Sequence, residues 1–379
     1  MSTPEVYIVS AVRTAIGSFG GALKEVPLSQ LATTAVSAAL QRSGCAAERV
    51  GHVVMGNVIP TEARDAYLGR VAAMQAGIPK ETPAFNVNRL CGSGLQAIVS
   101  AAQSLLLGDC DIAIGAGAES MSRGAYLLPG ARWGGRMGDM QAVDYMLGIL
   151  HDPFHRIHMG ITAENIAERL GISREAQDAL ALQSQQRAAR AIAEGRFAGQ
   201  IVPVEVKTRK GVQLFEVDEH VRGETSLEQL AAMKTAFKAG GTVTAGNASG
   251  LKSDNLRPLA RLVSYAHAGV DPELMGLGPI PATRLALQRA GLSVADLDVI
   301  ESNEAFAAQA CAVASELDFD PAKVNPNGSG ISLGHPVGAS GAIIATKAIH
   351  ELHRIQGRYA LATMCIGGGQ GIAVVFERV

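Results

Sequence analysis

Two cysteines and one histidine, far apart along the chain, each lie in a glycine-rich turn. Cys91 is in the turn Asn-Arg-Leu-Cys-Gly-Ser-Gly, Cys365 is in Met-Cys-Ile-Gly-Gly-Gly, and His335 follows Gly-Ser-Gly-Ile-Ser-Leu-Gly. A cysteine thiolate can hold an acyl group, while a second thiol or an imidazole can move a proton at an acidic carbon next to a carbonyl. Together the three residues predict carbon–carbon bond chemistry on thioesters.

Cys91 precedes a segment, 94–107, whose apolar residues recur at helical spacing. The free N–H groups and the macrodipole at a helix N-terminus predict a lowered thiol pKa, and Gly92 and Gly94 leave room for a substrate carbonyl. Taken alone, a cysteine is more often a small buried core residue. The other two turns favour the interpretation of Cys91 as a nucleophile.

His335 lies between a glycine and a proline, in a loop where a core histidine gains little. We therefore interpret it as the base towards the Cys91 thiol. Cys365 ends a buried strand, where catalytic groups of open α/β sheets gather. Asn303 also follows a strand-like run, 297–301. Its amide could orient a water or the imidazole, or simply form a turn, and the local sequence leaves both open.

Other reactive residue types are interpreted as structural. The remaining cysteines have no glycine turn: Cys45, Cys110 and Cys311. A dense polar cluster matches no strong metal signature, so no metal site is predicted there: His151, Asp152, His155 and His158. The segment 115–120 lacks the full glycine pattern of a dinucleotide loop, which argues against NAD binding.

The composition suits one large or two medium globular domains, since 47% of the 379 residues are hydrophobic and 18% are charged. The 33 basic residues are matched by 35 acidic ones, so no nucleic-acid or anionic-membrane partner is indicated. No apolar run reaches the length of a membrane span, and residues 1–10 do not resemble a signal peptide. Five cysteines without a disulfide or zinc spacing indicate a cytoplasmic protein with reduced thiols.

The two ends of the chain repeat one order of elements around the reactive turns. The expected strands and helices are strand 52–56, helix 94–107, strand 111–115, helix 341–352, strand 359–364 and strand 371–376. Buried runs joined by helices favour an α/β fold with mostly parallel or mixed sheets covered on both faces. We expect two similar α/β halves, stacked so that the helices after the Cys91 and His335 turns lie buried between them.

The middle of the chain is more polar and holds two amphipathic helices, 162–171 and 173–195, the second with Ser173 as its N-cap. We interpret it as an inserted loop domain that covers the ligand and makes subunit contacts. The expected division is 1–120 (N-terminal half), 121–246 (loop domain), 247–256 (a shortened return to the N-terminal half) and 257–379 (C-terminal half).

On these residues the chain resembles the thiolase family along nearly its whole length, most closely the bacterial β-ketothiolases of the acetyl-CoA C-acyltransferase type. The matching stretches are 11–17, 88–94, 117–122, 158–165, 303–306, 334–336 and 365–371. The resemblance implies a thiolase-like fold, with mixed five-stranded sheets stacked in layers around buried helices. It also implies reversible Claisen condensation of two acyl-CoA molecules to a 3-ketoacyl-CoA, or the reverse thiolytic cleavage, by a ping-pong mechanism.

The resemblance assigns roles to individual residues. Cys91 would be the acylated nucleophile, His335 its activating base and Cys365 the acid/base at the α-carbon. Asn303 would hold a water that forms one oxyanion site with His335, and the N–H groups of Cys91 and Gly367 would form the other.

Coenzyme A is implied as a substrate rather than a tightly bound cofactor, lying along the loop domain. The matching tunnel positions are His158, Met159, Arg222, Phe237, Ala245, Ser249 and Phe306. The family also implies a homotetramer built as a dimer of dimers, and a place in fatty acid or polyhydroxyalkanoate metabolism.

The sequence departs from the family after Leu251, where a strand and a helix of the first half are absent. Losing a core strand would expose its neighbour's edge and remove several buried side chains, each worth about 1.5–3 kcal/mol. We therefore expect the gap to mark a piece missing from the sequence or the structure rather than a natural shortening.

Two rival classes remain open. A β-ketoacyl synthase shares the expected fold and the nucleophilic cysteine, but it would have two histidines and no second catalytic thiol. A non-catalytic acyl-CoA-binding protein would keep the tunnel, yet it would have no use for Cys91, His335 and Cys365 together.

Overall fold

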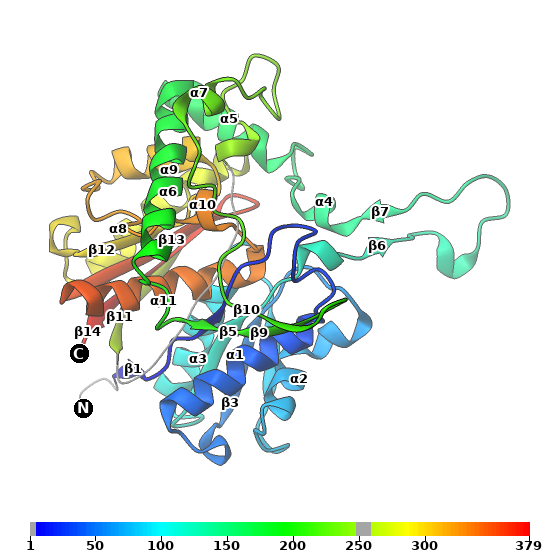
Figure 1. Cartoon of the computed structure of the whole chain (residues 1–379), viewed down its shortest axis with the longest axis vertical. Coiled ribbons are helices and arrows are strands. Elements are labelled where there is room, and N and C mark those ends of the chain that lie inside the picture. The colour runs from blue at the N-terminus through cyan, green and yellow to red at the C-terminus, as the bar shows by residue number, and fades with distance from the viewer. Residues whose placement is uncertain (1–4, 248–258) are drawn as a thin grey trace.

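A computed structural model of the chain describes residues 5–247 and 259–379 (Figure 1). Two sheets are separated by a pair of buried helices, α3 and α11, and each sheet carries further helices on its outer face. The expected stack, in which the helices after the Cys91 and His335 turns lie between two α/β halves, is confirmed.

The N-terminal half holds a three-stranded parallel sheet in the order β4-β3-β5, with α1 and α2 on one face and α3 on the other. Its elements are β1 (Val6–Ile8), β2 (Arg13–Thr14), α1 (Leu28–Ser43), β3 (His52–Gly56), α2 (Leu68–Gln75), β4 (Ala84–Val87), α3 (Ser93–Leu106) and β5 (Ala113–Gly117).

The C-terminal half holds a mixed five-stranded sheet in the order β1-β11-β14-β13-β12, in which only β12 and β13 run parallel. The central strands β13 and β14 are apolar and buried on both faces, between α11 and α8, as the sequence predicted. The elements are β11 (Ala260–Gly269), α8 (Pro279–Ala290), β12 (Val299–Ser302), α9 (Ala307–Glu316), α10 (Gly330–Leu333), α11 (Val337–Ile355), β13 (Tyr359–Ile366) and β14 (Gln370–Arg378).

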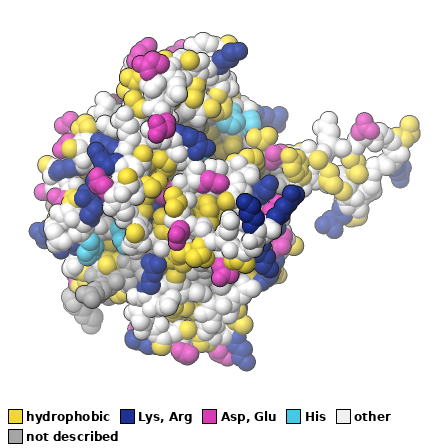
Figure 2. All heavy atoms as spheres, viewed as in Figure 1, with side chains coloured by type: hydrophobic (Ala, Val, Ile, Leu, Met, Phe, Trp, Pro, Cys, Tyr) yellow, Lys and Arg dark blue, Asp and Glu magenta, His cyan; other side chains and the backbone are white. Residues whose placement is uncertain are grey.

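The middle segment packs over both halves and includes a projecting arm. Its elements are β6 (Tyr126–Leu127), β7 (Val143–Asp144), α4 (Tyr145–Ile149), α5 (Met159–Leu170), α6 (Arg174–Ala193), β8 (Ile201–Val202), β9 (Val204–Thr208), β10 (Gly211–Phe215) and α7 (Leu227–Ala231). The Ser173 side chain accepts a hydrogen bond from Ala176 N, so the predicted N-cap of α6 is confirmed. The arm around β6 and β7 extends away from the body (Figures 1 and 2), and its Trp133 and Met137 side chains are 89% and 97% exposed.

Glycines allow α3 and α11 to touch near their N-terminal ends. A Cβ atom on Gly94 would lie 2.5 Å from the backbone N of Ala342, and one on Gly341 would collide with the backbone N of Leu95. Gly94 and Leu95 lie in the first turn of α3, and Gly341 and Ala342 lie in the second turn of α11. The turns that carry Cys91 and His335 are therefore brought together.

The N-terminal half differs from the expected five-stranded sheet. Its sheet has three strands in the described residues, and β1 pairs with β11 of the other sheet. The structure covers all 379 residues of the sequence, so the structure lacks no piece of it, and the expectation that the sequence itself lacks one stays a prediction. Ser249, Leu251 and the predicted return segment beyond Asn247 lie outside the described residues.

Candidate active site

The Cys91 turn connects β4 to α3 and is held by Ser93. The Ser93 hydroxyl accepts a hydrogen bond from Arg89 N at 2.8 Å and donates one to Leu90 O at 2.7 Å. Leu90 adopts a positive φ of 45°, which tightens the turn. A Cβ atom on Gly92 would lie 2.5 Å from the Ile366 side chain, so this turn packs directly against the Cys365 turn.

Cys365 lies at the end of β13 and is fully buried, followed by a turn in which Gly368 and Gly369 have φ of 79° and 80°. The negative charge that Cys91 carries as a thiolate contributes to raising the pKa of Cys365, after the larger effect of burial. The backbone N–H of Gly367 donates to the Cys91 sulfur, which acts to lower the pKa of that thiol. The structure therefore brings Cys91, Cys365 and Gly367 into one site.

The predicted direction of the Cys91 pKa was wrong. Burial raises the pKa of the Cys91 thiol to about 11, and it outweighs the opposing hydrogen bonds from the backbone N–H groups of Gly367 and Cys91. The free energy lost when the thiolate is removed from water exceeds the stabilisation that these two N–H hydrogen bonds provide. The resting Cys91 is a thiol at neutral pH, so a base must take its proton when the sulfur attacks.

His335 is prepared for that task by Ser340, which the sequence analysis missed. Nδ1 of His335 is 2.6 Å from the Ser340 hydroxyl oxygen, which is 2.9 Å from the carbonyl of Pro336. The hydroxyl has one proton and donates it to that carbonyl, so it must accept from Nδ1–H. This assignment leaves the lone pair on Nε2. A serine one turn into the helix that follows the histidine was the available signal.

The electrostatics of His335 agree with this tautomer. Burial lowers the pKa of His335 to about 4, so the imidazole is neutral at pH 7 and able to accept a proton. Nε2 is buried and has no hydrogen-bond partner among the described residues. Such an atom is costly to bury unless substrate or protein groups use it during the reaction.

Asn303 follows β12, and its backbone N donates to Thr363 O at 3.0 Å. Its amide Nδ2 is buried and also lacks a partner among the described residues. A cavity of about 10 Å³ is lined by Asn303 together with Gly334 and Ser340, next to His335 in the chain and in space. The buried amide without a partner and the adjoining cavity favour a functional role for Asn303 over a turn-forming one.

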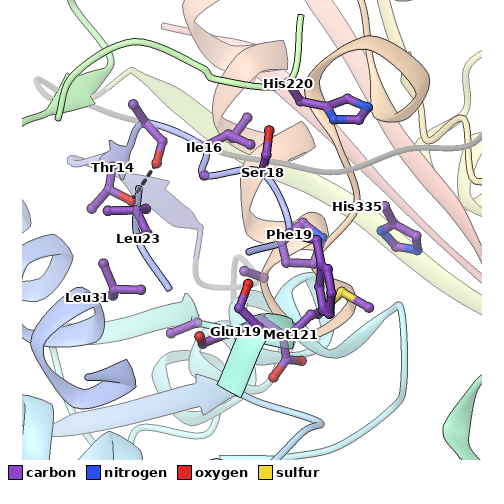
Figure 3. A pocket seen from close by; sticks show the side chains of 17 residues that line it. Thr14, Ile16, Ser18, Phe19, Leu23, Leu31, Glu119, Met121, His220 and His335 are labelled. Atoms are coloured by element: carbon purple, nitrogen blue, oxygen red, sulfur yellow. Dashed lines mark hydrogen bonds between the residues drawn. The ribbon is translucent and has the colours of Figure 1, made fainter. Parts of the chain in front are cut away.

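A larger cavity of about 250 Å³ borders His335 (Figure 3). Phe19, Met121 and His220 lie around it, and the Glu119 carboxylate lies at its edge. Burial raises the pKa of Glu119 to about 8 despite hydrogen bonds from the N–H groups of Ile59, Gly338 and Val58. None of the predicted coenzyme A contacts lines this cavity. The cavity was not predicted from the sequence, because its wall combines the loop 14–23 with residues 118–122, His220 and His335, which are far apart in the chain.

Four of the predicted coenzyme A positions gather beside Cys365. The His158 ring stacks on Phe237, with centroids 4.6 Å apart, and Phe237 meets Phe306 edge-on at 6.1 Å. Met159, Phe306 and Cys365 belong to the same buried cluster, with Phe237 packed against it. These side chains form an apolar wall that ends at the second thiol.

The other predicted positions are not brought to this wall. Arg222 and Ala245 are exposed, and the Arg222 guanidinium donates to the carbonyls of Glu219 and Val221. Ser249 lies outside the described residues. The described residues hold no group of three or more side chains placed to bind a metal ion, and His155 contacts Asp152 and Glu273 instead.

The raised thiol pKa predicts how Cys91 reacts with iodoacetamide. Below a pKa of about 11 the thiolate fraction grows about tenfold per pH unit, so the alkylation rate should keep rising from pH 7 to pH 10. Mass spectrometry of the Cys91 peptide gives this rate, with glutathione, of pKa near 8.5, as the reference thiol. A Cys91 rate that levels off near neutral pH would contradict the dominance of burial.

Comparison with known proteins agrees with this site. Residues 6–254 match the N-terminal domain of thiolases, and residues 256–378 match the C-terminal domain. The chain therefore belongs to the thiolase family. The predicted class, an acyltransferase of the β-ketothiolase type that acts on coenzyme A thioesters, is confirmed.

Individual relatives cover nearly the whole chain. The chain is 63% identical to β-ketothiolase BktB of Cupriavidus necator over 393 aligned positions, covering 100% of both chains. Human mitochondrial 3-ketoacyl-CoA thiolase superposes with a TM-score of 0.96 at 44% identity, covering 99% of each chain. An acetyl-CoA acetyltransferase structure from Bacillus anthracis gives a TM-score of 0.95 at 43% identity, covering 99% of this chain and 98% of that one.

The comparison also shows how much shorter this chain is than its Cupriavidus necator relative. Because 393 aligned positions exceed the 379 residues of this chain, at least 14 positions of the Cupriavidus necator alignment have no counterpart here. In the described part of the chain, no helix is both long and apolar enough to cross a membrane.

Proposed function

We propose that the chain joins two short acyl-CoA molecules, or cleaves a 3-ketoacyl-CoA with coenzyme A, through an acyl group held on Cys91. The proposal is carried by two neighbouring thiols, of which Cys91 packs in the cluster of Val337, two residues after a neutral His335 whose Nε2 is buried and unpartnered. Each half-reaction needs a sulfur and a proton acceptor, and the site holds both.

In the first half-reaction, Nε2 of His335 takes the Cys91 proton while the sulfur attacks the thioester carbonyl. The N–H groups of Cys91 and Gly367 stabilise the oxyanion, which the contact of Gly367 N–H with the Cys91 sulfur supports. The carbon–sulfur bond of the substrate then breaks, and the departing coenzyme A thiolate takes the proton from His335. The enzyme is left as a thioester on Cys91.

In the second half-reaction, Cys365 first gives up its own proton to solvent, and its thiolate removes a proton from the α-carbon of the incoming acyl-CoA; the carbanion then attacks the Cys91 thioester. The acylated Cys91 sulfur carries no charge, so it does not oppose the thiolate form of Cys365 as a Cys91 thiolate would. The amide Nδ2 of Asn303 donates to a water, and that water donates to the enolate oxygen. Cys91 leaves as a thiolate and takes from Cys365 the proton that came from the α-carbon, and Cys365 regains its own proton from solvent as the 3-ketoacyl-CoA departs.

Coenzyme A enters along the wall formed by His158, Phe237, Met159 and Phe306, which ends at Cys365. A related human mitochondrial thiolase has been solved in complex with CoA, at 43% identity to this chain. Arg222, Ala245 and Ser249 complete the coenzyme site in this proposal. The loop domain, 121–246, supplies the cover, and the C-terminal half begins at residue 257.

The assembly proposed is a homotetramer, a dimer of dimers in the cytoplasm. The projecting arm supports it, because Trp133 and Met137 are large apolar side chains exposed far from the body. The metabolic setting proposed is fatty acid or polyhydroxyalkanoate metabolism.

The decisive experiment separates a thiolase from an acyl-CoA-binding protein. Acetyl-CoA should leave an acetyl group on the Cys91 peptide and should block its alkylation by iodoacetamide. Mass spectrometry of that peptide reads both. Protection from alkylation without an acetyl adduct would indicate binding alone and would refute the proposed reaction.

Removing the Phe237 ring should weaken substrate binding more than chemistry. Phe237→Ala deletes the ring stacked on His158, so KM for acetyl-CoA should rise about tenfold, the equivalent of about 1.4 kcal/mol, with kcat little changed. Phe154→Ala is the matched control, because that ring is 70% exposed. Steady-state kinetics measure both, and an unchanged KM in Phe237→Ala would place coenzyme A elsewhere.

A further inference from the structure

A buried carboxyl group, Glu119, lies beside the reacting groups but takes no part in the two proposed half-reactions. It follows β5 by two residues, is 7% exposed, and borders the same cavity as His335 (Figure 3). Burying a carboxyl group is unfavourable unless its oxygens are hydrogen-bonded. The contacts of Glu119 therefore indicate what it does.

Four N–H groups converge on Glu119, and each of its oxygens accepts two of them. Oε1 accepts from Asn57 Nδ2 at 2.9 Å and from Ile59 N at 3.0 Å. Oε2 accepts from Val58 N at 3.2 Å and from Gly338 N at 2.8 Å. An ionised carboxyl group has about four acceptor positions, so all of them are occupied and none is left for a proton. The group therefore holds these donors as a carboxylate, although burial alone raises its pKa and favours the protonated form.

The four donors belong to two segments that flank the reacting groups. The first segment, 57–59, follows β3, and its apolar side chains belong to a buried cluster against which Cys91 packs. The second segment is the first turn of α11, where Gly338 lies three residues after His335. Glu119 thus connects the wall beside the nucleophile to the start of the helix that follows the base.

The first turn of α11 fits tightly against the end of the N-terminal sheet. A Cβ atom on Gly338 would lie 2.6 Å from Glu119 Oε2. Cβ atoms on Gly56 and Gly117, the last residues of β3 and β5, would lie 2.7 Å and 2.5 Å from the Gly338 carbonyl oxygen. Ser340, whose hydroxyl accepts from the imidazole, is only two residues further along the chain. A shift of Gly338 would therefore displace the group that orients the base.

The charge of Glu119 does not assist the nucleophile. After the larger effect of burial, this charge contributes to raising the pKa of the Cys91 thiol, so it opposes formation of the thiolate. Any benefit to acylation must therefore come from the N–H groups that the carboxylate holds in place.

We propose that Glu119 is a positioning residue for acylation: its carboxylate fixes the first turn of α11 against segment 57–59 and so sets where Nε2 of His335 meets the Cys91 sulfur. The inference rests on the proposed function, in which that imidazole takes the thiol proton. A reacting pair that is displaced by about 1 Å can lose about 100-fold in rate. Loss of the carboxylate therefore slows acylation, although no group that touches the substrate is removed.

Glu119→Gln tests the inference with little change in side-chain shape. Whichever way the amide turns, its NH₂ group faces at least one backbone N–H, because Ile59 N lies on one side and Gly338 N on the other. The single-turnover rate of Cys91 acetylation should fall about 10–100-fold, while the acetyl-CoA concentration that gives half the maximal rate changes little. Mass spectrometry of the Cys91 peptide measures the rate.

Asp298→Asn is the matched control. The Asp298 carboxylate also accepts two backbone N–H groups, from Arg358 at 2.6 Å and Tyr359 at 3.1 Å, but it does so in the C-terminal sheet. This variant should acetylate within about twofold of the unaltered protein. A loss as large as that of Glu119→Gln would show that any damaged buried carboxylate slows the reaction, and it would overturn the inference.

The same substitution in a His335→Asn background separates a positioning role from a purely structural one. Without the imidazole Glu119 has no base to position, so Glu119→Gln should lower the remaining rate by less than about twofold. An equal loss in both backgrounds, or no loss in the protein that keeps His335, would overturn the inference.

The inference and the proposed function fail in different ways. An unchanged acetylation rate in His335→Asn would refute the proposed base and the inference with it, whereas a slow His335→Asn with equal losses from Glu119→Gln refutes the inference alone. If circular dichroism shows that Glu119→Gln does not fold, Asn57→Ala replaces it, because it removes one of the four donors. Asn57→Ala should slow acetylation about threefold or more only where His335 is present, and an equal loss in both backgrounds would again refute the inference.

Discussion

Replacing Cys91 by serine should reduce acetyl transfer from acetyl-CoA to the protein by about 10⁴-fold or more. The serine hydroxyl keeps the position but is a far weaker nucleophile than a thiolate, and the His335 base cannot compensate. Replacing Cys365 by alanine should have a different result. Acetylation of Cys91 should persist, while α-proton exchange and condensation are lost, because the first half-reaction does not use Cys365.

Two assays distinguish the Cys91→Ser variant from the Cys365→Ala variant. Radiolabelled acetyl on the protein measures the first half-reaction, and exchange of the acetyl-CoA methyl protons with deuterated solvent measures the second. Cys45→Ala is the control, since Cys45 is a partly buried thiol outside the site. Should Cys365→Ala fail to acetylate while Cys91→Ser still does, the two thiols have exchanged roles and the assignment falls.

Replacing His335 by asparagine should lower the rate of Cys91 acetylation by about 10³-fold or more, because a resting thiol of pKa about 11 then has no base. Ser340→Ala should cost less, about 10–100-fold in kcat, with little change in KM. It leaves the imidazole in place but removes the acceptor that holds the proton on Nδ1. Ser340→Thr, which keeps a hydroxyl, should recover much of the loss.

The dependence of kcat/KM on pH below 8 independently checks that His335 is neutral. Burial lowers the pKa of His335 to about 4, so kcat/KM should not fall as pH drops from 8 to 6 and should decline only as pH approaches 4. A decline centred near 6.5 would mean that the imidazole is solvated as in a free histidine. Equal rates for Ser340→Ala and the unaltered protein would show that the serine does not position the imidazole.

The reactive turns could be predicted from the sequence because each is local. The order of turn, helix and strand around Cys91 and His335 fixed the two halves, and glycines marked the places where helices approach. Ser340 was missed because its role depends on the hydrogen bond from its hydroxyl to the Pro336 carbonyl, which the spacing of residues does not indicate. The pKa of Cys91 was predicted in the wrong direction because a helix N-terminus is visible in a sequence, whereas the depth of burial is not.

The N-terminal sheet shows a second limit. The sequence showed that a strand was absent after Leu251, and from this alone an incomplete protein was expected. Pairing of β1 with β11 depends on contacts between residues more than 250 positions apart, so it could not be foreseen from local patterns. Phe237 and Met159, which the family resemblance assigned to the coenzyme A tunnel, pack in the same cluster as Cys365, and no local pattern in the sequence indicates this.

The contact between α3 and α11 has a consequence for how the enzyme responds to its solution. Gly94 packs against Ala342 of α11, so the positive end of α3, equivalent to about half an elementary charge, is buried next to the Cys91 turn. Mobile ions do not penetrate between the packed helices. Added salt screens exposed charges over about 8 Å at physiological ionic strength, yet it leaves this field intact. The acylation rate at saturating acetyl-CoA should therefore be nearly independent of ionic strength.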